Sequence, residues 1–273
     1  MAWTWIPDSA PGAWPYFLLG TLAMVIIGVG KTGFGPSMAM LAVPLMILAC
    51  GSAPLANGIL LPVLILSDYI AVVLWRGKWD FRVVAQTLPG TLAGIALAWG
   101  LFKVCGVSQV GKDRLDAALK IAVGVIALGF VVLQAIRAIR GRPVTVSPGP
   151  AHATAVGAVA GVTSTFAHAA GPVMAIYLLG QRMEAGKYVA TTAVYFWIVN
   201  QIKLVPAWDL GWLNLASMQY SLVLVPAAVG GTFLGVWLQN RVGQKQFTGI
   251  VYALLAAAGA YLCYQGIGLL GFW

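Results

Sequence analysis

Two short glycine-rich segments contain the residue types that are best suited to binding a charged ligand. They read GVGKTGFGPS (residues 28–37) and STFAHAAGP (residues 164–172). Each ends in Gly-Pro before an apolar run, and proline suits the first turn of a helix because its missing N–H would have no intrahelical partner there. We therefore expect a helix to begin at the end of each segment, with free N–H groups and a positive dipole end that favour an anion.

The side chains in both segments fit the same chemistry. Lys31 supplies a cation, His168 supplies a titratable donor, and the glycines would let a ligand approach the backbone. These groups would bind a small anion that is rich in oxygen atoms. The predicted binding residues of the two segments are Lys31, Thr32, Gly33, Gly35, Ser37, Ser164, His168 and Gly171.

Further polar residues interrupt long apolar runs. Asp68 lies inside ILLPVLILSDYIAVVLW, and Asn200 and Lys203 lie inside YFWIVNQIKLVP. An ionisable group deep in an apolar helix is costly, so it is a functional candidate by default. We predict that Asn200 and Lys203 contact the ligand. Asp68 could relay a proton, as could His168, or Asp68 could pair with a basic residue such as Lys31.

Structural roles remain open for the same residues. Lys31 and Lys203 could extend to a membrane interface, His168 could be a satisfied interior histidine, and hydroxyl groups in apolar helices often bond back to their own helix. Asp68 could serve only in a structural ion pair.

The elements that hold these residues are membrane-spanning helices. Of the 273 residues, 60% are hydrophobic and 8% are charged, whereas a soluble domain typically has about 25% charged residues. Apolar runs near the length of about 20 residues that a span needs are residues 54–75, 83–102, 115–133, 213–238 and 248–270. The sequence predicts an all-α integral membrane protein embedded in a lipid bilayer.

Several other classes of protein are disfavoured. The basic residues lie in short connections between apolar runs, as in membrane loops, so the net charge of +9 does not indicate a nucleic-acid partner. The three cysteines are scattered and the two histidines lack partners at metal-ligand spacing, so we predict no metal site and no cofactor. GVGKT is not a nucleotide-binding loop, because Val25 stands where its first glycine would be.

The chain repeats itself at an offset of roughly 130–137 residues. Gly35-Pro36 matches Gly171-Pro172, Trp79-Asp80 matches Trp208-Asp209, and LPGTLAGIALAWGLF from Leu88 matches VPAAVGGTFLGVWLQ from Val225. We predict a first half at residues 1–142, a linker at 143–150 and a second half at 151–273.

Each half opens with two apolar runs around one glycine-rich segment, and the second run is short. A helix of nine residues spans about 14 Å at 1.5 Å per residue and cannot cross a hydrocarbon core of about 30 Å. We predict a hairpin of short or broken helices in each half, followed by three transmembrane helices. The total is ten helices, of which about eight are full spans. Because each half then crosses the membrane an odd number of times, the two repeats are inverted.

The distribution of charge agrees with this topology. If both hairpins turn back, ten lysines and arginines lie on the side opposite the termini and five lie on the side of the termini. The positive-inside rule then makes the opposite side cytoplasmic and places both termini outside.

The same segments resemble the TauE/SafE family of sulfite exporters. The likeness is carried by GVGKTGFGPSMAMLAVPLMIL, LLPVLILSDYIAVVLWRGKWD, TFAHAAGPVMAIYLLGQRM and YFWIVNQIKLVP, and it covers nearly the whole chain. Ala170 and Pro36 depart from the family pattern, which has glycine there. The resemblance implies a membrane permease that moves sulfite or an organosulfonate such as sulfoacetate, often as export, in the bacterial inner membrane. Both termini would then be periplasmic. Lys31, Asp68, His168 and Lys203 fall on motif positions of the family.

The expected function is therefore a secondary transporter, not an enzyme. It would export a small sulfur-containing anion by alternating access around two hairpin tips at the midplane, with protons as possible coupling ions. The alternatives are a transporter for another small anion such as a carboxylate, and a membrane-embedded enzyme. The oligomeric state is not indicated.

Overall fold

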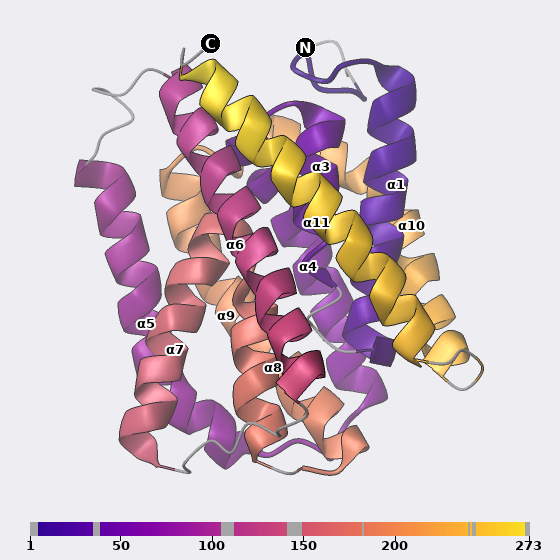
Figure 1. The fold of residues 1–273 in the computed structure, drawn as a ribbon, viewed down its shortest axis with the longest axis vertical. Coiled ribbons are helices and arrows are strands. Elements are labelled where there is room, and N and C mark those ends of the chain that lie inside the picture. Colours follow the sequence, from indigo (N-terminus) through magenta and orange to yellow (C-terminus); the bar gives the residue numbers. More distant parts are fainter. Residues whose placement is uncertain are drawn as a thin grey trace.

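The computed structural model describes residues 5–34, 39–104, 112–140, 149–181, 183–239, 241 and 244–270. Every regular element in these ranges is a helix, which confirms the predicted all-α class (Figure 1). The elements are α1 (Ala13–Val29), the π-helical segment η1 (Gly30–Phe34), α3 (Ala42–Cys50), α4 (Ala53–Leu74), α5 (Phe81–Val104), α6 (Lys112–Arg140), α7 (Pro150–Ala167), α8 (Ala170–Gly180), α9 (Ala185–Asp209), α10 (Leu215–Gln239) and α11 (Gln244–Leu269).

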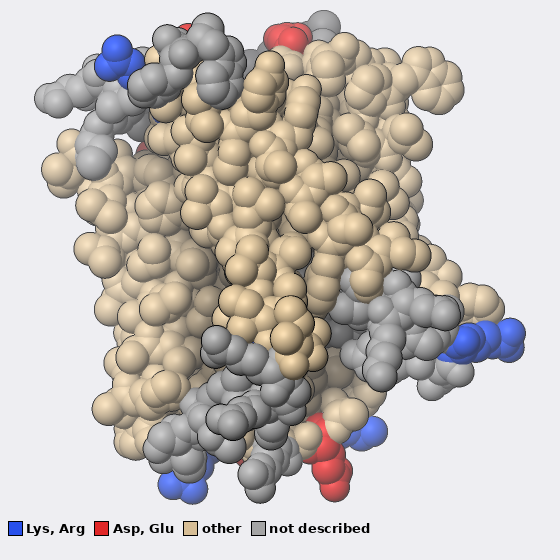
Figure 2. Space-filling view, viewed as in Figure 1, with Lys and Arg blue, Asp and Glu red and all other residues tan. Residues whose placement is uncertain are grey.

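The helices are those of an integral membrane protein. Six of them in the described ranges are long and apolar enough to cross a bilayer, namely α4, α5, α6, α10, α11 and the α1 segment that continues into η1. On the face drawn in Figure 2, Lys, Arg, Asp and Glu lie toward the two ends, and the broad belt between is free of them in its described part. This belt matches the hydrocarbon layer, where charged side chains are costly.

Both predicted hairpins turn back on themselves. The Ser9 hydroxyl, just before α1, donates to the carbonyl of Cys50 at the end of α3, over 2.6 Å. In the second hairpin, His152 near the start of α7 stacks on Tyr177 near the end of α8, with ring centroids 6.2 Å apart. The start of α1 and the end of α11 lie at the same end of the bundle (Figure 1), as expected if each half crosses an odd number of times.

The starts of the short helices differ slightly from the predictions. Helix α8 is predicted to begin at Pro172, and it begins two residues earlier, at Ala170. The predicted start at Pro36 lies outside the described residues, and the regular helix α3 begins at Ala42.

Helices of the predicted first half pack against helices of the predicted second half. Helix α5 packs along α7, α10 packs along α1, α6 packs along α11, and α4 lies beside α9. Two related halves joined about a two-fold axis would pack in this way. The boundaries at 142 and 151 stay a prediction, because residues 141–148 lie outside the described residues.

Glycines allow the closest of these helix contacts. Gly90 and Gly94 of α5 face the carbonyl groups of Thr154 and Ala158 on α7, and Gly157 of α7 faces the carbonyl group of Thr87. Such small residues four apart let the backbones of membrane helices approach closely. Gly231 and Gly235 of α10 lie in the same way against α1.

Replacing Gly90 by leucine should separate α5 from α7 and lower the melting temperature in detergent by several degrees. The reason is that a β-carbon at Gly90 would overlap the Thr154 carbonyl oxygen. Gly100→Ala is the matched control, since a β-carbon there meets nothing within 4 Å. Equal melting temperatures for the two variants would contradict this packing.

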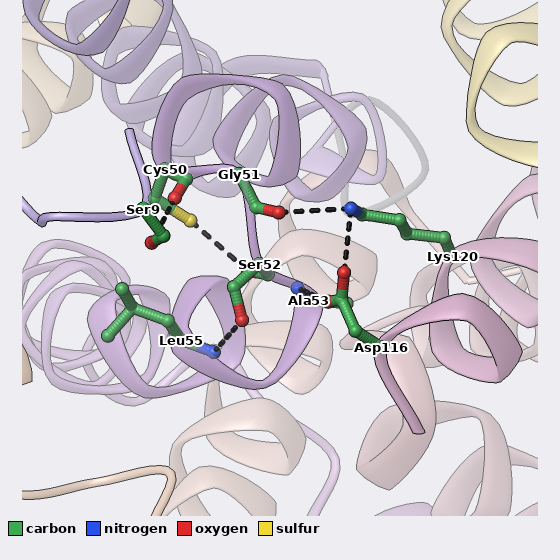
Figure 3. Close-up of polar contacts among 8 residues, drawn as sticks. All are labelled: Ser9, Cys50, Gly51, Ser52, Ala53, Leu55, Asp116 and Lys120. Carbon is green, nitrogen blue, oxygen red and sulfur yellow. Dashed lines mark hydrogen bonds and ion pairs between the residues drawn. The ribbon is translucent and has the colours of Figure 1, made fainter. Parts of the chain in front are cut away.

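A buried ion pair fixes the end of the first hairpin (Figure 3). Lys120 of α6 contacts Asp116 one turn earlier at 2.6 Å and donates to the carbonyl of Gly51 at 2.9 Å. The other oxygen of Asp116 accepts from the backbone N–H of Ala53. Gly51 has φ +79, a left-handed conformation that favours glycine and lets the chain turn from α3 into α4.

Two lysines that the charge count assigned to the side of the termini are therefore not surface residues. Lys120 is 6% exposed and Lys203 is 4% exposed. Without these two lysines, three basic residues remain on the side of the termini, against ten on the opposite side. The charge bias that predicts a periplasmic location for the termini is therefore stronger.

Candidate functional site

An ion pair and an amide join three elements at the centre of the bundle. Lys31 on η1 contacts Asp68 on α4, with Nζ 2.5 Å from Oδ1. Asn200 on α9 donates through Nδ2 to Oδ2 of the same carboxylate at 2.7 Å. All three residues are buried, and the Lys31 ammonium also lies 4.4 Å from the ring centroid of Phe196, a cation–π contact. Pairing with Lys31 is one of the roles that the sequence allows for Asp68.

The π-helical turn sets the direction of Lys31. Helix α1 is regular to Val29, and Gly30–Phe34 then forms a π-helix instead of another α-helical turn. Single π-turns of this kind occur frequently at functional sites because they re-aim side chains. This turn is the glycine-rich kink that the sequence predicts.

A second cluster lies around Lys203 of α9. Its Nζ lies 2.5 Å from His168 Nδ1 and donates to the Ser164 hydroxyl at 3.1 Å. The other ring nitrogen of His168, Nε2, lies 3.1 Å from the backbone carbonyl of Asn57. Because that carbonyl can only accept, the network assigns the imidazole proton to Nε2 and leaves Nδ1 to accept from the Lys203 ammonium.

The backbone at His168 is unusual. His168 ends α7 with φ 48, the one positive φ at a residue other than glycine in the described ranges. A histidine in this left-handed region costs free energy, and such residues cluster at functional sites. The turn places the imidazole beside α4 and α9.

One cavity connects the two clusters; we call it the central cavity. It admits only about one water molecule. The start of both short helices reaches it, through Ala42 and Val43 of α3 and Gly171 of α8. Its polar residues are Lys31, Ser164, His168 and Asn200. Neither short helix has a side chain that caps its N-terminus, so their dipoles and N–H groups add positive potential there.

Charge does not balance within these two clusters. Lys31 and Asp68 neutralise each other, but among the described residues no carboxylate lies within ion-pair distance of Lys203. A buried ammonium without a counter-charge is costly, and such a group gives up its proton unless an anion binds beside it. A bound anion would supply that charge.

The structure separates the predicted binding residues into three groups. Lys31, Ser164, His168, Gly171 and Asn200 line the central cavity, and Lys203 contacts two of them. Thr32 is not among the lining residues, because its hydroxyl lies 2.7 Å from the carbonyl of Thr232 on α10. Gly33 lies in η1, and Gly35 and Ser37 lie outside the described residues.

Two residues that contact the site are not predicted from the sequence. Asn57 of α4 contacts His168 through its carbonyl group, and Phe196 of α9 covers the Lys31 ammonium. Asn57 is a polar residue in an apolar run, the same signal that singled out Asp68. Nothing in the sequence distinguishes Phe196 from the other aromatic residues.

The fold and this cluster define a class of protein. Short helices that end inside the membrane, with their N-termini and buried charged groups around one cavity, are the architecture of a membrane transporter. The family model described as "Sulfite exporter TauE/SafE" matches residues 17–262, and the chain belongs to this family. Comparisons with curated proteins and with solved structures give no match.

Proposed function

We propose that this protein is a secondary transporter that exports a small sulfur-containing anion, sulfite or an organosulfonate such as sulfoacetate. The observation that carries the proposal is the buried ammonium of Lys203, which has no carboxylate partner in the described residues and lies beside a cavity that two helix N-termini reach. A sulfur oxyanion suits the chemistry of this site because each of its oxygens accepts hydrogen bonds and its charge balances Lys203. The central cavity has room for about one water molecule in this structure, so it must widen to hold the anion.

Each polar residue then has a defined task. Lys203, His168 and Ser164 bind the anion, together with the N–H groups at the start of α3 and α8. Lys31 adds positive potential, and Asp68 with Asn200 holds the Lys31 side chain in place. His168 and Asp68 are the candidates for proton coupling. Export of an anion needs little additional driving force, because an inside-negative membrane potential expels negative charge.

Two ion pairs between the predicted halves support alternating access. Lys187 in the first turn of α9 contacts Asp80 at 2.7 Å, and Lys103 at the end of α5 contacts Asp209, the last residue of α9, at 2.8 Å. The 22 residues of helix from Lys187 to Asp209 place the two pairs about 33 Å apart, at opposite faces of the membrane. Asp80 and Asp209 also correspond to each other in the repeat. Each pair must break for the cavity to open to its face.

The Asp80 carboxylate stays ionised at physiological pH. The hydrogen bond from Lys187 holds the pKa of the Asp80 carboxyl below its usual value. A carboxylate with a lowered pKa contributes stability above its unfolded pKa, about 3.9, and loses it only as pH falls through the still lower folded value. Proton coupling between pH 6 and 8 therefore belongs to groups other than Asp80.

Cross-linking either ion pair should stop transport. We would place cysteines at 80 and 187, or at 103 and 209, in a background with the three native cysteines replaced by alanine, and join them with a short reducible cross-linker. Both cross-linked proteins should lose transport and recover it on reduction, whereas single-cysteine variants should be unaffected. Full transport with either pair cross-linked would contradict alternating access between these halves.

Proteoliposome counterflow tests the substrate. Liposomes loaded with sulfite, sulfoacetate, acetate or no anion are diluted into labelled sulfite, with and without a pH gradient. Sulfite and sulfoacetate inside should drive uptake of the label, and acetate should not. Uptake driven by acetate alone would replace the sulfur anion with a carboxylate. We place the protein in a bacterial inner membrane with both termini periplasmic, where the direction of flow would be export.

A further inference from the structure

Of the two residues that the sequence suggests as proton carriers, Asp68 has no free position for a proton. Its Oδ1 contacts the Lys31 ammonium, and its Oδ2 accepts from the Asn200 amide. A proton on this carboxylate would remove one of the two contacts and leave the Lys31 ammonium without its counter-charge. The ion pair therefore holds Asp68 in its charged form.

His168 is closed to a second proton for a similar reason. Its Nε2 lies 3.1 Å from the carbonyl of Asn57, and its Nδ1 accepts from Lys203. A proton on Nδ1 would remove this acceptor from Lys203, and beside a charged Lys203 it would place two cations in contact. His168 therefore orients Lys203 and stays neutral.

Lys203 differs from both residues in its hydrogen bonds. Its Nζ contacts two acceptors, His168 Nδ1 and the Ser164 hydroxyl, and no other hydrogen-bond partner of Nζ lies in the described part of the chain. A neutral amine has two N–H groups and one free electron pair, so it satisfies both acceptors, whereas an ammonium has a third N–H left over. Without an anion, these contacts match the neutral form of Lys203.

The charged groups around Lys203 do not balance an ammonium. Lys31 on η1 and Asp68 on α4 act on it with opposite signs and neutralise each other in their own pair. Asp209 lies about 9 Å further along α9, where it pairs with Lys103 of α5. Helix α8 carries no charged residue. A bound anion would supply the counter-charge that the described residues lack.

A second cavity beside the central one gives the Lys203 amine a route for proton exchange. Asn57, His168 and Lys203 line this second cavity, which has room for about one water molecule. The Asn57 amide donates to the carbonyl of Phe166, but Asn57 Oδ1 is buried and has no partner among the described residues. A water there would donate to this oxygen. It could also donate to the free electron pair of a neutral Lys203 or accept from the third N–H of an ammonium.

We propose that Lys203 carries the coupling proton: it is neutral when the site holds no anion, and it takes up one proton together with each anion. The proton joins the free electron pair of Nζ as the anion arrives and returns to water as the anion leaves. A dianion would thus leave the cell with one net negative charge, which an inside-negative potential still expels. The inference rests on the proposed transport of sulfur anions and assigns the coupling to Lys203 in place of Asp68 and His168.

Proton uptake on anion binding tests the coupling. Sulfoacetate is the probe, because its carboxyl group titrates near pH 4, like other carboxyl groups, and its charge is constant at about pH 7–9. At pH 8, a pH indicator in weakly buffered detergent solution should record about one proton taken up per sulfoacetate bound. Affinity should fall about tenfold for each further pH unit, because the binding of anion and proton are linked.

The control and the contrary outcomes are distinct. Lys78→Met, which changes an exposed lysine between α4 and α5, should take up the same one proton per anion. Binding of sulfoacetate without proton uptake would overturn the coupling and leave the proposed function intact. A wild-type protein that neither binds sulfoacetate nor exchanges sulfite would instead overturn the proposed function.

Nuclear magnetic resonance can assign the proton to Lys203. In protein labelled with carbon-13 at lysine Cε, the signal that is missing from Lys203→Met belongs to Lys203. At pH 8 without anion it should have the chemical shift of a neutral amine, and sulfoacetate should move it to that of an ammonium, for which the exposed Lys78 is the reference. An ammonium signal from Lys203 without anion would overturn the proposal, wherever else a proton is taken up.

Discussion

Replacing Lys203 by methionine should reduce sulfite transport at least about 25-fold while the protein stays folded. Truncating one partner of a buried, hydrogen-bonded charge pair costs about 2–5 kcal/mol, and each 1.4 kcal/mol corresponds to a factor of ten. The anion would lose its counter-charge and its donor at once. Counterflow of labelled sulfite in proteoliposomes measures the loss.

The stability of the same variant separates a binding role from a structural one. Lys203 contacts no carboxylate in the described residues, so Lys203→Met leaves no buried charge unpaired, and methionine fills a similar volume. Its melting temperature without anion should equal or exceed that of the wild-type protein. Lys78→Met is the control, because this lysine is exposed between α4 and α5. A Lys203→Met protein that transports sulfite at the wild-type rate would remove Lys203 from the site.

Breaking the Lys31–Asp68 pair should have the largest effect on stability. In Lys31→Met the buried carboxylate keeps only Asn200, and in Asp68→Asn the buried ammonium loses its counter-charge. Removing one partner of a buried pair typically costs about 3–5 kcal/mol. The double variant Lys31→Met, Asp68→Asn buries no unpaired charge and should recover most of that loss. Chemical unfolding in detergent micelles measures the four proteins of this cycle.

Transport should behave differently from stability in this cycle. The double variant should fold but transport poorly, because Lys31 lines the central cavity and adds positive potential there. Lys187→Met with Asp80→Asn is the exposed control and should change stability little, since surface pairs are screened by water. Additive losses in the Lys31–Asp68 double variant would show that the two side chains do not compensate each other.

Much of the fold follows from the sequence alone. Apolar run lengths predict the helices, and the short runs after the two glycine-rich segments predict the hairpins. Asp68 and Asn200 are 132 residues apart, within the offset of the repeat. Equivalent positions near a two-fold axis face each other. The hydrogen bond between them at 2.7 Å agrees with that reasoning.

The details of the site depend on contacts that sequence patterns do not contain. Thr32 follows Lys31 directly, yet the π-turn sends it toward Thr232 on α10 while Lys31 contacts Asp68 on α4. From the sequence alone, Lys203 could be an interfacial lysine, because it lies near the end of an apolar run. It is buried because α9 extends two further turns to Asp209, so that Lys203 lies beside His168.

The ion pair between Asp116 and Lys120, by contrast, can be predicted from the sequence. Asp116 and Lys120 are four residues apart, a spacing that places both side chains on one face of a helix. The burial of this pair against Gly51 cannot be predicted in the same way, because it depends on how α6 meets the turn between α3 and α4 (Figure 3).

Equilibrium binding of labelled sulfite to the purified protein tests the central claim most directly, which is that an anion in the central cavity is the counter-charge of Lys203. Wild-type protein and Lys78→Met should bind sulfite saturably, unlabelled sulfoacetate should displace it, and Lys203→Met should show no saturable binding. Equal affinity of Lys203→Met and wild-type protein for sulfite would contradict the claim.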